Sequence, residues 1–142
     1  MKSIQDIMTK DVACCTSDDN LFEAATTMKQ RNVGSVPVCD NDKNLLGMVT
    51  DRDLVIRGYA QKKSGSSTIQ EVMSDKLTTC TPETSVEEAS KIMSEKQIRR
   101  LPVVEDGKLV GIVSLGDLSL EKYSNEAAGH ALEEISERPE VH

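Results

Sequence analysis

The sequence predicts an α/β (α+β) fold in which two β-α-β-β-α repeats pack with pseudo-two-fold symmetry and a C-terminal helix follows. The first observation is an internal repeat: residues 4–38 match residues 69–103, and residues 45–54 match residues 109–118. The second is an amphipathic helical pattern in each copy, and the third is a pair of short β-rich runs after it. One copy is too short to bury a good core alone, so the copies should pack on each other.

The first helix of each copy is predicted by apolar residues at helical spacing and by a capping box. In a capping box, the N-cap side chain and the side chain three residues further on each accept the other residue's backbone N–H. The apolar stripes are Leu21, Ala24, Ala25 and Met28, and Val86, Ala89 and Met93; the capping pairs are Asn20 with Glu23, and Ser85 with Glu88.

Two β-rich runs follow that helix in each copy, and their close spacing predicts an antiparallel hairpin. A second helix should begin after Thr50 and Ser114, and a short helical turn should precede the repeats around Ile4 and Ile69. Pro37 and Pro102 lack a backbone N–H, which predicts the start of a strand or an edge position. The predicted strands are Ser35–Cys39 and Leu45–Thr50, then Leu101–Val104 and Leu109–Ser114.

These patterns divide the chain into repeat 1 at residues 2–60, a linker at 61–68, repeat 2 at 69–122, and a C-terminal helix and tail at 123–142. The last part has a narrow apolar stripe, which should dock on the domain or on a second subunit. The stripe comprises Ala127, Ala128, Ala131, Leu132 and Ile135.

Composition excludes several classes of function. The net charge of −7 has the wrong sign for neutralising a nucleic-acid backbone, and the aromatic residues, Phe22, Tyr59 and Tyr123, are too few for base stacking. No apolar run approaches the roughly 20 residues that cross a bilayer, and the start lacks a signal-peptide pattern. Neither nucleic acid nor membrane is therefore an expected partner.

The four cysteines have neither metal-site nor disulfide-scaffold spacing. Buried, reduced thiols in a cytoplasmic protein are expected, with a redox switch through the adjacent Cys14 and Cys15 as the alternative. The other two are Cys39 and Cys80.

Residues that could carry catalysis are scarce. The histidines are His130, in the predicted C-terminal helix, and His142, so neither a catalytic nor a metal-binding histidine is expected. The phosphate loop GxxxxGK[ST] of nucleotide hydrolases does not occur, and no Ser/His/Asp or Cys/His set can be assembled. The chain is expected not to be an enzyme and to require no cofactor.

The ordered motifs IxDIM, LxEAxxxM, VxxVPV and LxGMVTxxDL, repeated with variations in the second copy, resemble a tandem cystathionine-β-synthase (CBS) domain pair, or Bateman module. The resemblance covers roughly residues 2–122 and is typical of a stand-alone bacterial CBS-pair protein. It implies two clefts between the repeats that bind adenosine-type ligands. It also implies a homodimer and a sensor role without chemistry.

Thr50 with Asp53, and Ser114 with Asp117, have two interpretations that do not exclude each other. A hydroxyl at the N-cap and an acidic residue at N3 start a helix, contributing about 1 kcal/mol. Alternatively, the hydroxyl donates to a phosphate at the helix N-terminus, and the carboxylate accepts from the ribose hydroxyls. The resemblance implies this second role, a nucleotide clamp.

An apolar slot with backbone hydrogen bonds would hold the base, although its candidate side chains are equally typical of core packing. The resemblance implies that each cleft joins the Asp of one repeat to the opening segment of the other. Site A then comprises Thr50, Arg52, Asp53, Val72, Met73, Ile98 and Arg99; site B comprises Ser114, Asp117, Ile7, Met8, Val33 and Gly34; Val36 and Leu101 are further candidates for the slot.

Site A gathers both arginines, whose guanidinium groups suit phosphate oxygens, while site B has Gly116 and Gly34 at the matching positions. Site A is therefore expected to bind more tightly and to prefer ligands with more phosphates. The alternative for Arg52 and Arg99 is a solvated face, or pairing with Asp51 or Glu105.

The leading interpretation is a non-catalytic regulatory module that binds AMP, ADP or ATP between the repeats and signals to an unidentified effector protein by a change of conformation. Two alternatives remain: a structural or protein-interaction module whose clefts are vestigial, and a binder of another adenosyl ligand such as NAD or S-adenosylmethionine. The sequence does not distinguish the ligand or count its phosphates.

Overall fold

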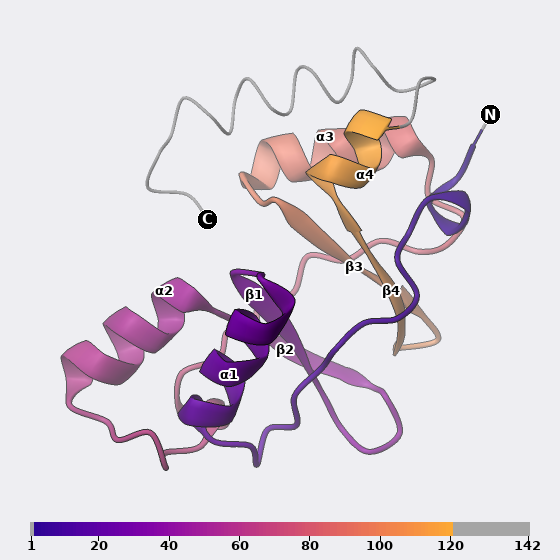
Figure 1. Ribbon diagram of the computed structural model, residues 1–142. Coiled ribbons are helices and arrows are strands. Elements are labelled where there is room, and N and C mark those ends of the chain that lie inside the picture. The colour runs from indigo at the N-terminus through magenta and orange to yellow at the C-terminus, as the bar shows by residue number, and fades with distance from the viewer. Residues whose placement is uncertain (1, 121–142) are drawn as a thin grey trace. The chain divides into compact units, whose positions relative to one another are not determined.

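The computed structural model describes residues 2–120 and divides into two compact units. Within the described residues, unit 1 comprises residues 2–12, 78–106 and 110–120, and unit 2 comprises residues 13–77 with 107–109. The predicted helix at 123–142 lies outside the described residues. Both units repeat one arrangement, in which a helix, a β-hairpin and a second helix follow one another (Figure 1).

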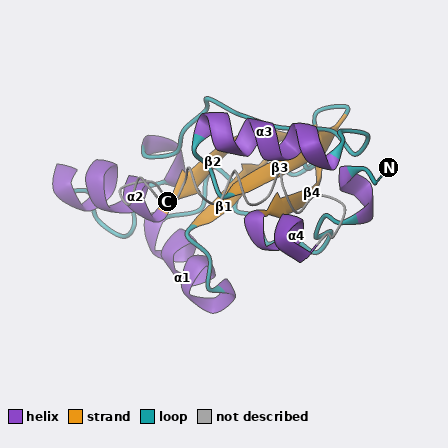
Figure 2. Cartoon of the chain, turned by 90° about the horizontal axis from the view of Figure 1, so that it is seen from above, coloured by secondary structure: helices purple, strands orange, loops and turns teal. Residues whose placement is uncertain are grey.

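Unit 2 holds α1 (Leu21–Arg31), β1 (Ser35–Cys39), β2 (Leu45–Thr50) and α2 (Asp51–Asp53). Unit 1 holds α3 (Val86–Lys96), β3 (Arg100–Glu105), most of β4 (Lys108–Ser114) and α4 (Leu115–Leu120). The strands pair as β1–β2 and β3–β4, two small sheets that Figure 2 shows in orange. The mixed helix and strand fold predicted from the sequence is confirmed.

The helix α1 forms where its sequence predicts. Glu23 donates its backbone N–H to Asn20 Oδ1 at 2.8 Å, and Asn20 donates its own to Glu23 Oε1 at 3.4 Å, which completes the capping box. Leu21, Ala24 and Met28 are buried, but Ala25 is exposed because it lies on the flank of this narrow stripe. The helix ends at Asn32, whose left-handed conformation (φ 55°) is typical of a C-terminal cap.

Each β-hairpin is extended by the opening segment of the other repeat. Met48 of β2 and Ser74 exchange two backbone hydrogen bonds of 2.9 Å in unit 2. Thr9 and Ile112 of β4 exchange bonds of 2.8 and 2.9 Å in unit 1. Because these opening segments are far along the chain from the strands they pair with, each unit contains parts of both repeats.

The first strand predicted for each copy is reduced to a single parallel bridge, Cys15 with Val38 and Cys80 with Val103. Cys15 donates to the Pro37 carbonyl at 2.9 Å, and Cys39 donates to the Cys15 carbonyl at 2.8 Å. Pro37 is therefore inside β1 and not at its start, and Pro102 holds the matching place in β3. Each of these strands belongs to a two-stranded sheet, so the predicted edge position agrees with the sheet topology. Proline is tolerated there because the bridge uses its carbonyl and does not require its N–H.

The cores of both units are aliphatic, as the scarcity of aromatic residues predicts. The unit 2 core contains Leu21, Met28, Val36, Val38, Val49, Ile69 and Val72 among others, and the unit 1 core contains Ile4, Val86, Met93, Leu101, Val103, Val113 and Leu118 among others.

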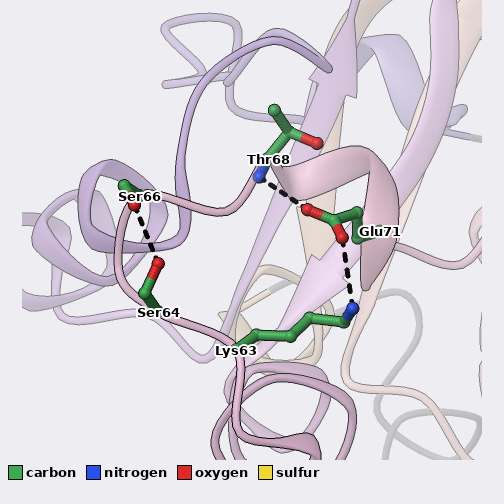
Figure 3. A network of polar contacts seen from close by, with 5 residues as sticks. All are labelled: Lys63, Ser64, Ser66, Thr68 and Glu71. Carbon is green, nitrogen blue, oxygen red and sulfur yellow. Dashed lines mark hydrogen bonds and ion pairs between the residues drawn. The ribbon is translucent and has the colours of Figure 1, made fainter.

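A polar network orders the linker between the repeats (Figure 3). Lys63 Nζ contacts Glu71 Oε1 at 3.1 Å, and Thr68 donates its backbone N–H to the second oxygen of Glu71 at 3.1 Å. The Ser64 and Ser66 hydroxyls lie 2.8 Å apart. These contacts stabilise the turn that precedes residues 69–74, and Ser74 at the end of this segment pairs with β2.

Candidate functional site

The loop between β2 and α2 brings Thr50 and Asp53 together. Asp53 donates its backbone N–H to Thr50 Oγ1 at 3.0 Å, and Thr50 donates its own to Asp53 Oδ2 at 2.9 Å. Both residues are half-buried, so each keeps part of its surface in contact with solvent. The predicted helix cap is therefore present in unit 2.

Ser114 and Asp117 reproduce this geometry at the start of α4 in unit 1. Asp117 donates its backbone N–H to Ser114 Oγ at 3.1 Å, and Ser114 donates to Asp117 Oδ2 at 2.8 Å. These two residues are also half-buried. The repeated sequence motif thus becomes a repeated three-dimensional motif.

The cap uses only half of the hydrogen-bonding capacity of each pair. Thr50 Oγ1 acts as an acceptor, so its own hydroxyl hydrogen can still be donated to a ligand. Asp53 uses Oδ2, and within residues 2–120 its Oδ1 makes no hydrogen bond. An oxygen of this kind can accept from ribose hydroxyls. Capping and ligand binding are therefore compatible, and the cap holds both groups in position.

The backbone donors at the start of α2 are already engaged. Asp51 donates its N–H to the Gly34 carbonyl at 2.9 Å, and Arg52 donates its N–H to Asp51 Oδ1 at 2.8 Å. In unit 1, Leu115 donates to the Arg99 carbonyl at 3.1 Å. A phosphate near α2 would therefore depend on side chains such as Thr50 and Arg52 more than on the helix N-terminus.

The two arginines of predicted site A lie in different units. Arg52 is exposed in unit 2, and Arg99 is exposed in unit 1. Neither side chain pairs with a carboxylate within residues 2–120, so the alternative pairing with Asp51 or Glu105 is absent there. Of Arg52 and Arg99, one lies in the unit of each hydroxyl–carboxylate pair, so the excess of positive charge predicted for site A requires residues of both units.

The candidate base-binding residues differ in burial. Val36, Val72 and Leu101 are at most 1% exposed and belong to the cores, so core packing explains their side chains. The others keep partial exposure and remain available to line a slot: Ile7, Met8, Val33, Met73 and Ile98.

The structure sorts the predicted site residues by unit. Five residues of site A share unit 2 with two residues of site B, and the remaining six share unit 1. Unit 2 holds Thr50, Arg52, Asp53, Val72, Met73, Val33 and Gly34, and unit 1 holds Ser114, Asp117, Ile7, Met8, Ile98 and Arg99. A site that combines residues of both units stays a prediction.

Sequence reasoning missed Arg57. Its Nη1 donates to the carbonyls of Val72 and Met73, each at 3.4 Å. No periodicity marks this residue; the available signal is an isolated cation four positions after Asp53, within the apolar run LVIRG.

The cysteines are free thiols. Burial raises the pKa of Cys80 to about 11, and burial together with the neighbouring Cys14 raises the pKa of Cys39 to about 12. Burial, with Asp19 nearby, also raises the pKa of Cys15. A high thiol pKa means little thiolate at neutral pH, which disfavours nucleophilic chemistry at these three residues.

Within residues 2–120, no group of three His, Cys, Asp or Glu side chains could hold a metal ion. In the same part of the chain, no helix has the length and apolar character needed to span a bilayer.

The CBS domain family profile matches residues 4–58 and 69–122, the two repeats. The chain belongs to the CBS domain family. This CBS pair is 48% identical over 136 residues to the CBS domain-containing protein YhcV of Bacillus subtilis, covering 96% of each chain. The tandem organisation predicted from the motifs is thereby confirmed.

Two solved structures similar to this CBS pair contain adenosine-based ligands. One is CBSX2 in complex with AMP, with a TM-score of 0.74 and 27% identity over 82% of this chain and 92% of that chain. The other is the CBS domain pair of MJ0100 with 5′-methylthioadenosine and S-adenosylmethionine. It has a TM-score of 0.74 and 29% identity over 84% and 94% of the chains.

Proposed function

We propose that this CBS pair is a non-catalytic regulatory module that binds an adenine nucleotide at its hydroxyl–carboxylate pairs. The observation that carries the proposal is their occurrence in both units with the same capping bonds, which within residues 2–120 engage one oxygen of each carboxylate. The AMP and S-adenosylmethionine complexes of its structural relatives support an adenosine-containing ligand.

Each group of the pair has a definite role in this proposal. The Thr50 hydroxyl donates to a phosphate oxygen, Arg52 supplies positive charge beside it, and Asp53 Oδ1 accepts from the ribose. Ser114 and Asp117 do the same in unit 1, without an arginine between them. The half-buried apolar residues line the base slot, and Val33, Gly34, Ile98 and Arg99 complete the sites.

Calorimetric titration with AMP, ADP and ATP tests the assignment. Asp53→Asn keeps an acceptor for the Thr50 N–H but removes the charge, so binding should weaken at least about tenfold while the fold is retained. Asp117→Asn tests the second pair. If Asp53→Ala leaves all three nucleotides bound normally and Asp117→Ala abolishes binding, the assignment of the tighter site to Thr50 and Asp53 is wrong.

A second candidate is an adenosyl ligand without phosphate, because one structural relative holds 5′-methylthioadenosine and S-adenosylmethionine. Arg52→Ala separates the two candidates, since it should weaken AMP but leave a ligand without phosphate unaffected. If no tested ligand gives a thermal shift, where about 2.7 kcal/mol is expected at 100 times the dissociation constant, the interaction-module alternative is favoured.

The proposal includes a homodimer in the cytoplasm that signals to a separate effector protein. Five large apolar residues of unit 2 are exposed: Phe22 (69%), Val55 (56%), Ile56 (47%), Tyr59 (84%) and Leu77 (37%). Contiguous exposed apolar residues mark interaction surfaces, and Val55, Ile56 and Tyr59 follow closely along one segment. Ile56→Asp should lower the mass measured by light scattering to that of a monomer; an unchanged mass would exclude this surface. The free thiols support a reducing compartment.

A further inference from the structure

The helix that begins at α2 changes its geometry directly after Asp53. Residues Leu54–Gly58 form a π-turn, and Tyr59 donates its N–H to the carbonyls of Leu54 and Val55. Figure 1 draws the whole segment as one helical ribbon. In the other repeat, residues 118–120, which match residues 54–56, belong to the regular α-helix α4. π-Turns of this kind are frequent at functional sites.

Arg57 extends from this π-turn to the opening segment of repeat 2. Its Nη1 donates to the Val72 and Met73 carbonyls at 3.4 Å each, long contacts that a ligand can replace. Those carbonyls are held in place because Ser74, the next residue, exchanges two backbone hydrogen bonds with Met48 of β2. The guanidinium therefore occupies a fixed pair of acceptors.

Arg52 and Arg57 lie on opposite sides of Asp53 along the helix. Arg52 precedes the carboxylate, on the side where Thr50 would hold phosphate. Arg57 follows it by four residues, about 6 Å along an α-helical axis, on the side of Met73 and the proposed base slot. The two arginines should therefore act on different parts of one ligand.

Arg57 also reverses the hydrogen-bonding character of that slot. Free carbonyls at Val72 and Met73 would accept from the 6-amino group of adenine, whereas a guanidinium is only a donor. A 6-oxopurine offers acceptors at O6 and N7, the pair of atoms to which arginine binds in guanine. Adenine must displace Arg57, and a 6-oxopurine need not.

We propose that Arg57 is a specificity-determining residue of the unit 2 site: it weakens the binding of 6-aminopurines such as AMP and strengthens that of 6-oxopurines, so that the preference of the site for adenine nucleotides is narrowed. This inference rests on the proposed nucleotide-binding function. In repeat 2 the sequence places Glu121 at the matching position, outside the described residues, so the two sites differ in charge at this place.

AMP and IMP test the inference because they differ only in the 6-substituent of the purine and the accompanying proton on N1 of IMP. Both are titrated calorimetrically into the full chain carrying Asp117→Asn, which leaves the unit 2 site to be measured. Arg57→Met keeps the aliphatic part of the side chain and removes the guanidinium. AMP should then bind more tightly and IMP more weakly, changing the ratio of their affinities about tenfold.

Arg52→Ala is the matched control, since it should weaken both nucleotides equally and leave their ratio unchanged. Circular dichroism establishes that each variant is folded, and Arg57→Leu, which also lacks the guanidinium, serves as the second variant if Arg57→Met is not. If the Asp117→Asn protein binds AMP or IMP but Arg57→Met leaves the ratio of the two affinities unchanged, the specificity role of Arg57 is wrong and the proposed function stands. If the Asp117→Asn protein binds neither nucleotide, both the specificity role of Arg57 and the proposed nucleotide binding are wrong for the unit 2 site.

Discussion

Gly47 lies where a neighbouring backbone comes too close for a side chain. A Cβ atom at this position would be 2.5 Å from the Ser74 carbonyl oxygen and 3.3 Å from Met73 Sδ. Gly111 has the same role in the other repeat, where a Cβ would meet Met8 Sδ at 2.7 Å and the Thr9 carbonyl oxygen at 3.0 Å. The glycine that opens GMVT and GIVS is therefore required by the opening segment that pairs with each strand.

Gly47→Ala should destabilise the protein by about 1–3 kcal/mol, because the clash involves backbone that is held by the Met48–Ser74 pairing. Urea denaturation measures the change. Gly65→Ala is the control: its Cβ would meet the Phe22 Cβ at an ordinary 3.5 Å, and the expected change is within about 0.5 kcal/mol. Equal effects of the two substitutions would contradict the role assigned to Gly47.

Cys80 should make the stability of the protein sensitive to alkaline pH. Burial raises its pKa from 9.0 to about 11 in the folded state. Between these values the unfolded chain loses the proton and the folded chain keeps it, so folding becomes less favourable as pH rises. Below about pH 9 this contribution is fully retained.

The measurement compares urea denaturation at about pH 8 and about pH 10.5 for the wild type and Cys80→Ala. The wild type should lose roughly 1–2 kcal/mol more than the variant over this interval. Cys15 and Cys39 are present in both proteins, so their titration cancels. Parallel curves for the two proteins would show that Cys80 is not the group responsible.

At the level of elements, the N-cap of α1 offers a direct test of local stabilisation. Asn20→Ala removes the acceptor of the Glu23 N–H, and the expected loss is about 1 kcal/mol of unfolding free energy. Asn20→Asp retains the acceptor and adds a negative charge at the helix start, so it should be at least as stable as the wild type. A fully stable alanine variant would mean that packing alone defines this helix end.

Local elements were predictable because their signals are local. The stripe Leu21, Ala24 and Met28 predicted α1, and the apolar runs around DNDKN predicted β1 and β2 with their observed limits. A strand start at Pro37 was wrong, because the proline is tolerated inside β1: Cys15, which pairs with β1 from outside the hairpin, uses the proline carbonyl and requires no N–H.

The candidate site, like the fold, was predictable where its residues are close together in the sequence. The pairs Thr50–Asp53 and Ser114–Asp117 are adjacent in sequence, and their geometry follows from helix capping. The contact of Arg57 with the Val72 carbonyl was not predictable, because it needs both the π-turn and the pairing of a distant segment with β2.

At the scale of the whole chain, the two compact units do not coincide with the two sequence repeats, because each unit contains residues of both repeats. Unit 2 includes residues 69–77, which open repeat 2, and lacks residues 2–12, which open repeat 1. The Met48–Ser74 bonds and the buried Ile69 and Val72 show what the later segment supplies: an edge for β2 and two core side chains. A fragment cut at repeat boundaries would lose all of these.

Two fragments of equal length, residues 13–77 and residues 1–65, test this consequence. Both contain α1, β1 and β2, but only the first contains Ile69, Val72 and the partner of Met48. Loss of a strand partner and two fully buried side chains should leave residues 1–65 largely unfolded, whereas residues 13–77 should show a cooperative, if marginal, transition. Hydrogen exchange at Val36, Val38 and Val49 provides the measurement. The backbone amides of these core residues should be protected from exchange in residues 13–77, which include the segment 69–77, but not in residues 1–65. Equal protection in the two fragments would mean that the opening segments are dispensable, and that each sequence repeat folds by itself.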